Sequence, residues 1–160
     1  MSINITAPCN SLGYGVVSLN ILKALESIGA NPAAWFIGPV EAKPEDRELL
    51  QRVSDRTRFY DRSAASLRIY HQFDLAQHVG NGRHIGFPIF ELDKFNDIEK
   101  HHLSSVDVLF VTSEWAKNII ENNGITVPTK IVNLGVDLDV FNDRIPRKED
   151  GVTRFINIGK

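Results

Sequence analysis

The chain has 160 residues, of which 42% are hydrophobic and 24% charged, and its formal net charge is -2. These proportions suit a globular domain, and the small negative charge excludes the broad basic surface of a nucleic-acid-binding protein. One cysteine excludes an internal disulfide, and no run of 18 apolar residues is present to span a membrane, although peripheral membrane contact stays open. We expect a cytoplasmic protein, because the first ten residues lack the basic and apolar regions of a signal peptide.

Short apolar or β-branched segments alternate with amphipathic helical patterns along the chain. Predicted strands cover residues 3–6, 33–37, 58–60, 67–70, 84–89, 106–111 and 130–134. Predicted helices begin near Tyr14, at Pro44, near Lys94 and at Glu114. Gly29 and Gly124 are typical of the position just after a helix, and residues 74–83 are predicted to form a loop. This alternation predicts a doubly wound, parallel α/β sheet of the Rossmann-like type, with six or more strands.

Two glycines one residue apart, Gly13 and Gly15, flank Tyr14 at the predicted start of the first helix. Free backbone N–H groups and the helix dipole favour an anion at such a position. We expect Gly15 to let the backbone approach a ligand with no side chain in the way. A dinucleotide fingerprint is disfavoured, because Ser18 replaces its third glycine and the first acidic residue after the second strand is Glu41. A P-loop is excluded, because no Gly-Lys-Ser/Thr follows.

Polar residues follow several of the predicted strands, at the edge where open α/β sheets bind ligands. His71 and Asp74 follow one strand, Glu91 and Asp93 another, and Ser113 a third. Glu91 is the candidate catalytic group, because a carboxylate accepts hydrogen bonds from sugar hydroxyls. Helix capping is the structural alternative for Glu91, Asp93 and Ser113, and a hydrogen-bonded surface pair is the alternative for His71 and Asp74.

The carboxyl ends of the predicted strands should lie at one common edge of the sheet. We expect it to hold Cys9, Gly13, His71, Glu91 and Gly135 together.

No metal site is predicted. His101 and His102 are adjacent on a predicted helix and point about 100° apart, so they cannot share an ion. A meeting of His71, His78 and His84 across loops stays open as an alternative.

One pair of apolar residues is predicted to lie in the core. Trp115 and Ile119 are four residues apart on a predicted helix and therefore share one of its faces.

The segment VDVLFVTSEWAKNIIENNGITVPTKIVNLGVDLDVFN, residues 106–142, resembles the end of the N-terminal domain of retaining glycosyltransferases with the GT-B fold. These enzymes consist of two facing Rossmann-like domains. Leu134 stands where the family commonly has Asn or His. The loop Gly13-Tyr14-Gly15 is similar to the glycine loop of the family, and PIFELDKF, residues 88–95, is similar to a Phe-Glu-x-Asp element of one bacterial branch. FINIGK, residues 155–160, is similar to the strand that opens the second domain.

The resemblance implies that residues 1–141 form an acceptor-side domain. Residues 142–160 would be a linker and the first strand of a C-terminal nucleotide-sugar domain that is missing from this chain. The implied reaction transfers a sugar, with retention, from a nucleoside diphosphate sugar to a hydroxyl of a carbohydrate or lipid-linked acceptor. No further cofactor and no nucleic acid are implied, and the chain alone is expected to be inactive. The candidate substrate-binding residues are Gly13, Tyr14, Gly15, His71, Asp74, Asp93 and Ser113.

One alternative from a different class is kept. The chain would then be a stand-alone, flavodoxin-like binding or regulatory domain without catalysis.

Overall fold

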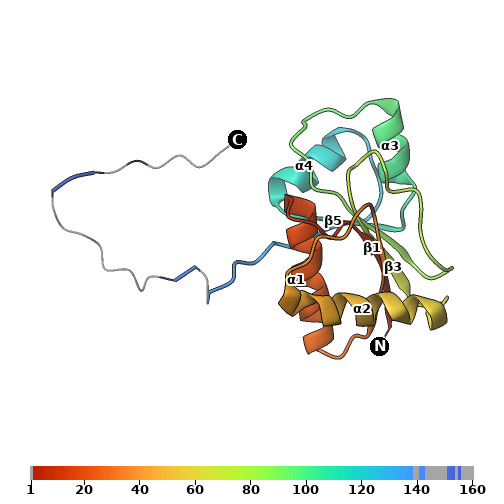
Figure 1. The fold of residues 1–160 in the computed structure, drawn as a ribbon. Helices are drawn as coiled ribbons and strands as arrows, with labels where there is room; N and C mark the ends of the chain where they lie inside the picture. The colour runs from red at the N-terminus through yellow and green to blue at the C-terminus, as the bar shows by residue number, and fades with distance from the viewer. Residues whose placement is uncertain (1, 139–140, 143–150, 154, 156–160) are drawn as a thin grey trace.

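The computed structural model describes residues 2–138, 141–142, 151–153 and 155. This part of the chain folds around one sheet of six strands, all paired in parallel, in the order β2-β1-β3-β4-β5-β6 (Figure 1). The strands are β1 (Ile3–Ala7), β2 (Pro32–Phe36), β3 (Ala65–Ile69), β4 (His84–Phe87), β5 (Val108–Val111) and β6 (Thr129–Ile131). The helices are α1 (Gly13–Ser27), α2 (Arg47–Asp55), α3 (Asp97–Ser104) and α4 (Glu114–Asn122), and the short 3₁₀ helices are η1 (Pro44–Asp46) and η2 (Arg56–Phe59). The predicted doubly wound parallel α/β fold is confirmed.

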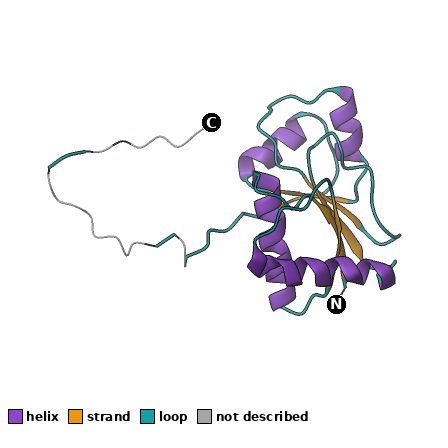
Figure 2. Cartoon of the chain, viewed as in Figure 1, coloured by secondary structure: helices purple, strands orange, loops and turns teal. Residues whose placement is uncertain are grey.

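Helices cover both faces of the sheet (Figure 2). On one face, Leu22 of α1 and Leu50 of α2 pack in a core cluster with Phe87 of β4. On the other face, Leu103 of α3 packs with helix α4 and with Leu109 of β5. The register partner of Leu109 is residue 86, the neighbour of Phe87, and successive side chains of a strand point to opposite faces. No helix in the described ranges has both the length and the apolar character needed to cross a bilayer.

Local sequence explains the ends of several helices. The side chain of Asn96 accepts a hydrogen bond from the N–H of Glu99 at 2.9 Å, and the Glu99 carboxylate accepts one from the N–H of Asn96 at 2.8 Å. This capping box starts α3 at Asp97, three residues later than predicted. Gly29 and Gly124, with φ of 71° and 77°, follow α1 and α4 as predicted.

The predicted strand at residues 58–60 is wrong. These residues belong to η2 and to its end, where the chain continues the helical turn of α2. The guanidinium group of Arg56 donates hydrogen bonds to Glu26 and to the carbonyl of Pro32, and the hydroxyl of Thr57 donates to the carbonyl of Ser54 at 2.6 Å. Phe59 is 92% exposed, so the burial that stabilises a strand residue is absent at this position.

The predicted linker and the first strand of the C-terminal domain occupy residues 142–160. Residues 143–150, 154 and 156–160, which carry most of the predicted linker and strand, lie outside the described residues.

Candidate functional site

A cavity of about 580 Å³ lies at the carboxyl-terminal ends of the strands. Its walls come from the start of α1 and from the segments that follow β3, β4 and β6. We call it the edge cavity, and its lining residues are Gly13, Tyr14, Val17, His71, Gln72, Ile89, Phe90, Glu91, Leu92 and Leu134. Open α/β sheets bind ligands at this position, and the volume lies within the range of about 300–1,000 Å³ that is usual for ligand pockets.

The structure brings together three of the five residues that were predicted to share one edge. Gly13, His71 and Glu91 line the edge cavity, and Gly135 is exposed directly after the lining residue 134. Cys9 differs, because it is buried in the core cluster beneath α1, and this burial raises the pKa of its thiol. Cys9 is therefore a packing residue.

Tyr14 joins α1 to the segment after β4. Its hydroxyl donates a hydrogen bond to the carbonyl oxygen of Ile89 and accepts one from the Ile89 N–H at 3.2 Å. Burial raises the pKa of Tyr14, and the hydrogen bond to Ile89 opposes this rise. Tyr14 thus stays protonated at neutral pH and holds the two walls of the cavity together.

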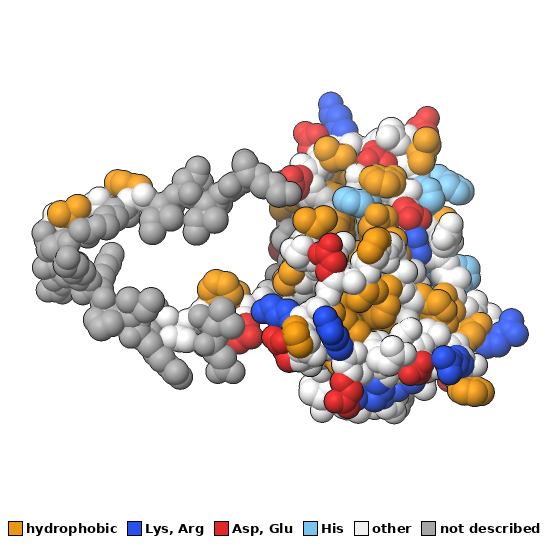
Figure 3. Space-filling view, in the orientation of Figure 1, with side chains coloured by type: hydrophobic (Ala, Val, Ile, Leu, Met, Phe, Trp, Pro, Cys, Tyr) orange, Lys and Arg blue, Asp and Glu red, His pale blue; other side chains and the backbone are white. Residues whose placement is uncertain are grey.

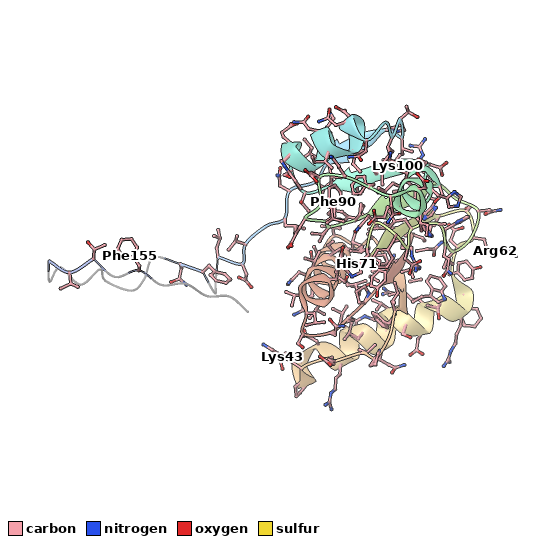
Figure 4. The ribbon with its side chains drawn as sticks, turned by 90° about the horizontal axis from the view of Figure 1, so that it is seen from above. Lys43, Arg62, His71, Phe90, Lys100 and Phe155 are labelled. Carbon is pink, nitrogen blue, oxygen red and sulfur yellow. The ribbon has the colours of Figure 1, made fainter. Side chains whose placement is uncertain are left out.

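His71 is set in a group of aromatic rings. Its ring stacks on Phe73 with centroids 5.0 Å apart and planes 7° apart, and it meets the rings of Tyr14 and Tyr70 edge-on at 4.7 and 4.9 Å. Figure 4 shows His71 beside α1, with Phe90 nearby. The ring nitrogens of His71 form no hydrogen bond with any described residue, so they are available to a ligand in the cavity.

Glu91 supplies the carboxylate of the cavity. It is exposed, and its side chain accepts no hydrogen bond from the described part of the chain. Its position places a charge in the cavity close enough to disfavour ionisation of the Tyr14 phenol. A free carboxylate near the unpaired imidazole of His71 can bind two neighbouring hydroxyl groups of one ligand.

The two glycines at the start of α1 have different surroundings. A Cβ atom at Gly13 would meet no heavy atom within 4 Å, and Gly13 lines the cavity. A Cβ atom at Gly15 would lie 2.2 Å from the backbone N and O of Asn10, and Gly15 is buried outside the cavity lining. The predicted reason for Gly15, close approach of the backbone to a ligand, is therefore corrected. Glycine is required here because a side chain would collide with the backbone of Asn10.

The loop before α1 is held by a side chain that follows β2. The carboxylate of Glu41 accepts hydrogen bonds from the N–H of Ser11 at 3.1 Å and from its hydroxyl at 2.8 Å. These bonds lower the pKa of Glu41. An acid after the second strand would bind ribose in a dinucleotide fingerprint, whereas in this structure Glu41 fixes the loop before α1.

Three further residues predicted to contact substrate lie outside the cavity lining. The carboxylate of Asp74 pairs with the buried guanidinium of Arg68 at 2.8 Å. Asp93 is exposed, and its carbonyl accepts a hydrogen bond from the side chain of Asn123 at 3.0 Å. Ser113 accepts a hydrogen bond from the N–H of residue 116 at 3.2 Å and caps α4, the structural alternative that the sequence favoured.

Trp115 was predicted to lie in the core, and this prediction is wrong. Its side chain is 49% exposed, and its ring centroid lies 6.0 Å from that of the cavity-lining Phe90. Ile119, four residues later, is partly buried and packs against the core beneath α4. The helix is rotated so that Ala116 and Ile120 face the core, which turns Trp115 toward the rim of the cavity.

The charge in the edge cavity comes from one residue. None of its ten lining residues is Lys or Arg, and Glu91 is its single carboxylate. A phosphate group bound there would meet a negative charge without a cation to offset it. The lining therefore favours a neutral, hydroxylated ligand over a phosphorylated one.

A second cavity, of about 820 Å³, lies near the amino-terminal ends of β1 and β2. Its arginines are already paired: Arg52 and Arg56 both bind Glu26, and Arg58 lies 3.5 Å from Asp55. These ion pairs leave little charge free for a ligand, so we regard the edge cavity as the better candidate site despite its smaller volume.

Comparison of the chain with protein-family models, with curated proteins and with solved structures finds no match. The residues of the edge cavity are therefore the structural basis for assigning a function.

Sequence reasoning missed the apolar part of this site. Phe90, Leu92 and Leu134 line the cavity, and the sequence shows them only as apolar residues near strand ends. Phe90 and Leu92 lie just beyond the predicted strand 84–89 and Leu134 ends the predicted strand 130–134, and this position at the strand ends is the signal that indicates such exposure.

Proposed function

We propose that this chain is the acceptor-binding part of a retaining glycosyltransferase. The donor would be a nucleoside diphosphate sugar, and a further domain would bind its diphosphate. The observation that carries the proposal is the edge cavity, in which Gly13, His71 and Glu91 converge from three segments without any lysine or arginine. The resemblance of residues 106–142 to the glycosyltransferase family supports the same assignment.

The roles of the side chains follow from their chemistry. Glu91 accepts hydrogen bonds from acceptor hydroxyls, and the imidazole of His71 donates or accepts one more. Tyr14 contributes indirectly, because its two hydrogen bonds to Ile89 fix the segment that carries Glu91. In the assembled enzyme, the N–H groups at the start of α1 would contact the leaving diphosphate jointly with groups of the further domain, because a helix N-terminus favours negative charge but the edge cavity itself supplies no cation.

Sugar transfer measured with the full-length protein, including the further domain, tests the proposal. We expect an acceptor glycoside to be extended from a radiolabelled nucleoside diphosphate sugar, with the anomeric configuration of the donor kept, as read by NMR. Glu91→Gln should lower kcat/KM for the acceptor at least tenfold. Glu114→Gln, a matched change in an exposed residue outside the cavity lining, should leave it unchanged. Inversion of configuration, or equal effects of the two variants, would contradict the proposal.

One observation favours the binding-domain alternative. The strand order β2-β1-β3-β4-β5 is that of flavodoxin-like domains, which bind a nucleotide at the same edge. Calorimetry on this chain separates the two functions. The proposal expects at best roughly millimolar affinity for a nucleoside diphosphate or flavin mononucleotide, because the cavity offers no cation and association costs several kcal/mol. Micromolar affinity for either compound would establish the alternative.

A further inference from the structure

Exposed hydrophobic side chains belong to the lining of the edge cavity or lie next to its lining residues. We call Leu12, Leu92, Trp115 and Leu134 the apolar rim, and their exposed fractions are 58, 46, 49 and 43%. Leu92 and Leu134 line the cavity, Leu12 immediately precedes α1, and Trp115 contacts the lining residue Phe90. Figure 3 shows hydrophobic side chains exposed between charged groups on one face of the molecule. A single exposed leucine is ordinary, whereas several around one cavity indicate a binding surface.

The interior of the cavity has a different character from its rim. His71 and Glu91 provide hydrogen-bonding groups inside it, and neither forms a side-chain hydrogen bond with the described residues. The charge of Glu91 disfavours an anionic group, and no lysine or arginine lines the cavity to reverse that preference. The site therefore combines a polar, anion-repelling interior with an apolar entrance.

We propose that the acceptor is an uncharged amphipathic glycoside. Its hydroxylated ring would lie between His71 and Glu91, and its apolar aglycone would lie across the apolar rim. The inference rests on the proposed function, which identifies the ligand as a sugar acceptor. It adds that this acceptor carries an apolar group and no charge. Covering Leu92 and Leu134 with an alkyl chain removes apolar surface from water, which gives such a ligand an advantage over a sugar alone.

Three probe compounds test this ligand class by calorimetry on the chain. They are methyl β-D-glucopyranoside, n-octyl β-D-glucopyranoside below its micelle concentration, and n-octyl sulfate. We expect the octyl glucoside to bind at least about tenfold more tightly than the methyl glucoside, since a tenfold gain needs only the burial of about two methylene groups. The octyl sulfate should bind more weakly than the octyl glucoside, because its charge meets Glu91.

Trp115 reports where the alkyl chain lies. The sequence has two tryptophans, and Trp35→Phe leaves Trp115 as the single tryptophan, which can be excited selectively over the tyrosines. Octyl glucoside should shift the Trp115 emission to shorter wavelength, and the double variant Leu92→Ser, Leu134→Ser should lose both the shift and the tenfold preference. Ile28→Ser is the matched control, because Ile28 is 76% exposed just after the far end of α1. Circular dichroism verifies that each variant is folded.

Several outcomes overturn the inference. Equal affinities for the methyl and octyl glucosides would do so, as would octyl sulfate binding as tightly as octyl glucoside, or equal losses in the rim and Ile28 variants. Rim-dependent binding to neutral phosphatidylcholine vesicles without binding of monomeric octyl glucoside would assign the rim to a membrane surface instead. None of these measurements contains a nucleotide sugar. If the chain binds octyl glucoside but the full-length protein transfers no sugar, the proposed function alone is refuted.

Discussion

The phenolic oxygen of Tyr14 binds both backbone groups of Ile89, as donor to its carbonyl and as acceptor from its N–H. Strand β4 ends at Phe87, and the next residue is Pro88, which has no N–H to continue the ladder. The Tyr14 hydroxyl therefore gives the backbone of Ile89 the two hydrogen bonds that a neighbouring strand would otherwise provide. This contact ties the first turn of α1 to the segment that carries Glu91.

Tyr14→Phe should lower the free energy of unfolding by about 1–3 kcal/mol, because two partly buried backbone groups of Ile89 lose their partner. Urea denaturation measures this difference. Tyr70→Phe is the matched control, since the Tyr70 ring lies in the same aromatic group and its hydroxyl forms no hydrogen bond with the described residues. Equal losses in the two variants would show that the Tyr14 hydroxyl adds nothing to stability.

Alanine at the two glycines of α1 should have opposite consequences. Gly15→Ala should destabilise the chain by about 1–3 kcal/mol, because its Cβ would force the backbone of Asn10 to move. Gly13→Ala should stay within about 0.5 kcal/mol of the parent, because open space surrounds that position. Thermal melts of both variants provide the measurement. A normal melt for Gly15→Ala would restore the earlier expectation that a ligand, and not Asn10, requires this glycine.

Asp74→Asn should act on stability and leave ligand binding largely intact. Arg68 is 5% exposed and donates hydrogen bonds to both the carboxylate and the carbonyl of Asp74. The variant leaves this guanidinium without its counter-ion, at a cost of about 2–3 kcal/mol, less than for a fully buried pair because Asp74 is partly exposed. Asp93→Asn, a change in an exposed residue, should cost almost nothing. A folded Asp74→Asn chain that has lost octyl glucoside binding would return Asp74 to the site.

His84 should make the chain sensitive to acid. Burial, and then the charge of the stacked His78, lower the pKa of His84 from 6.5 to about 4, while Asp107 opposes the shift and Arg68 adds to it. In the unfolded chain His84 binds a proton near pH 6.5, and in the folded chain it does so only near pH 4. The free energy of unfolding therefore falls as the pH is lowered between these values. The loss is on the order of 3 kcal/mol.

His84→Leu separates this effect from other acid-sensitive groups. Neither ring nitrogen of His84 has a hydrogen-bond partner in the described structure, so the variant should be at least as stable as the parent at pH 7. Its urea midpoint should then vary less between pH 6.5 and pH 4. His101→Gln, in an exposed residue of α3, should keep the parental slope. A parental slope in His84→Leu would exclude His84 as the cause.

Much of the fold could be predicted because its signals are local. Six of the seven predicted strands were found near their predicted positions, because buried parallel strands appear as apolar runs between turns. The failure at residues 58–60 has a tertiary cause, since the Arg56 contacts to Glu26 and Pro32 hold that segment in a helical turn. These contacts join residues 30 and 24 positions apart and leave no periodic pattern in the sequence.

The site could be predicted only in part, for a similar reason. The rule that ligands bind beyond the strand ends placed Gly13, His71 and Glu91 together. It could not distinguish them from Asp74, because the Arg68 guanidinium that engages Asp74 comes from within a strand. Trp115 was misjudged because spacing gives the residues that share a helix face, whereas packing decides which face is buried.

Glu91→Gln should change the affinities for neutral and anionic ligands in opposite directions. A carboxylate accepts stronger hydrogen bonds from hydroxyls than an amide does, so octyl glucoside should bind several-fold more weakly, as expected for part of the roughly 1.5–3 kcal/mol of a charged hydrogen bond. A nucleoside diphosphate should bind roughly threefold more tightly at low salt, since removing one charge about 6 Å away in a water-like dielectric is worth about 0.7 kcal/mol. High salt should abolish the second change and preserve most of the first, because it screens the repulsion and leaves the hydrogen bonds. Calorimetry with both ligands at two salt concentrations, with Glu114→Gln as control, gives all the comparisons. Parallel losses for the two ligands would mean that Glu91 acts by supporting the fold of its segment, and not by contact with whatever fills the edge cavity.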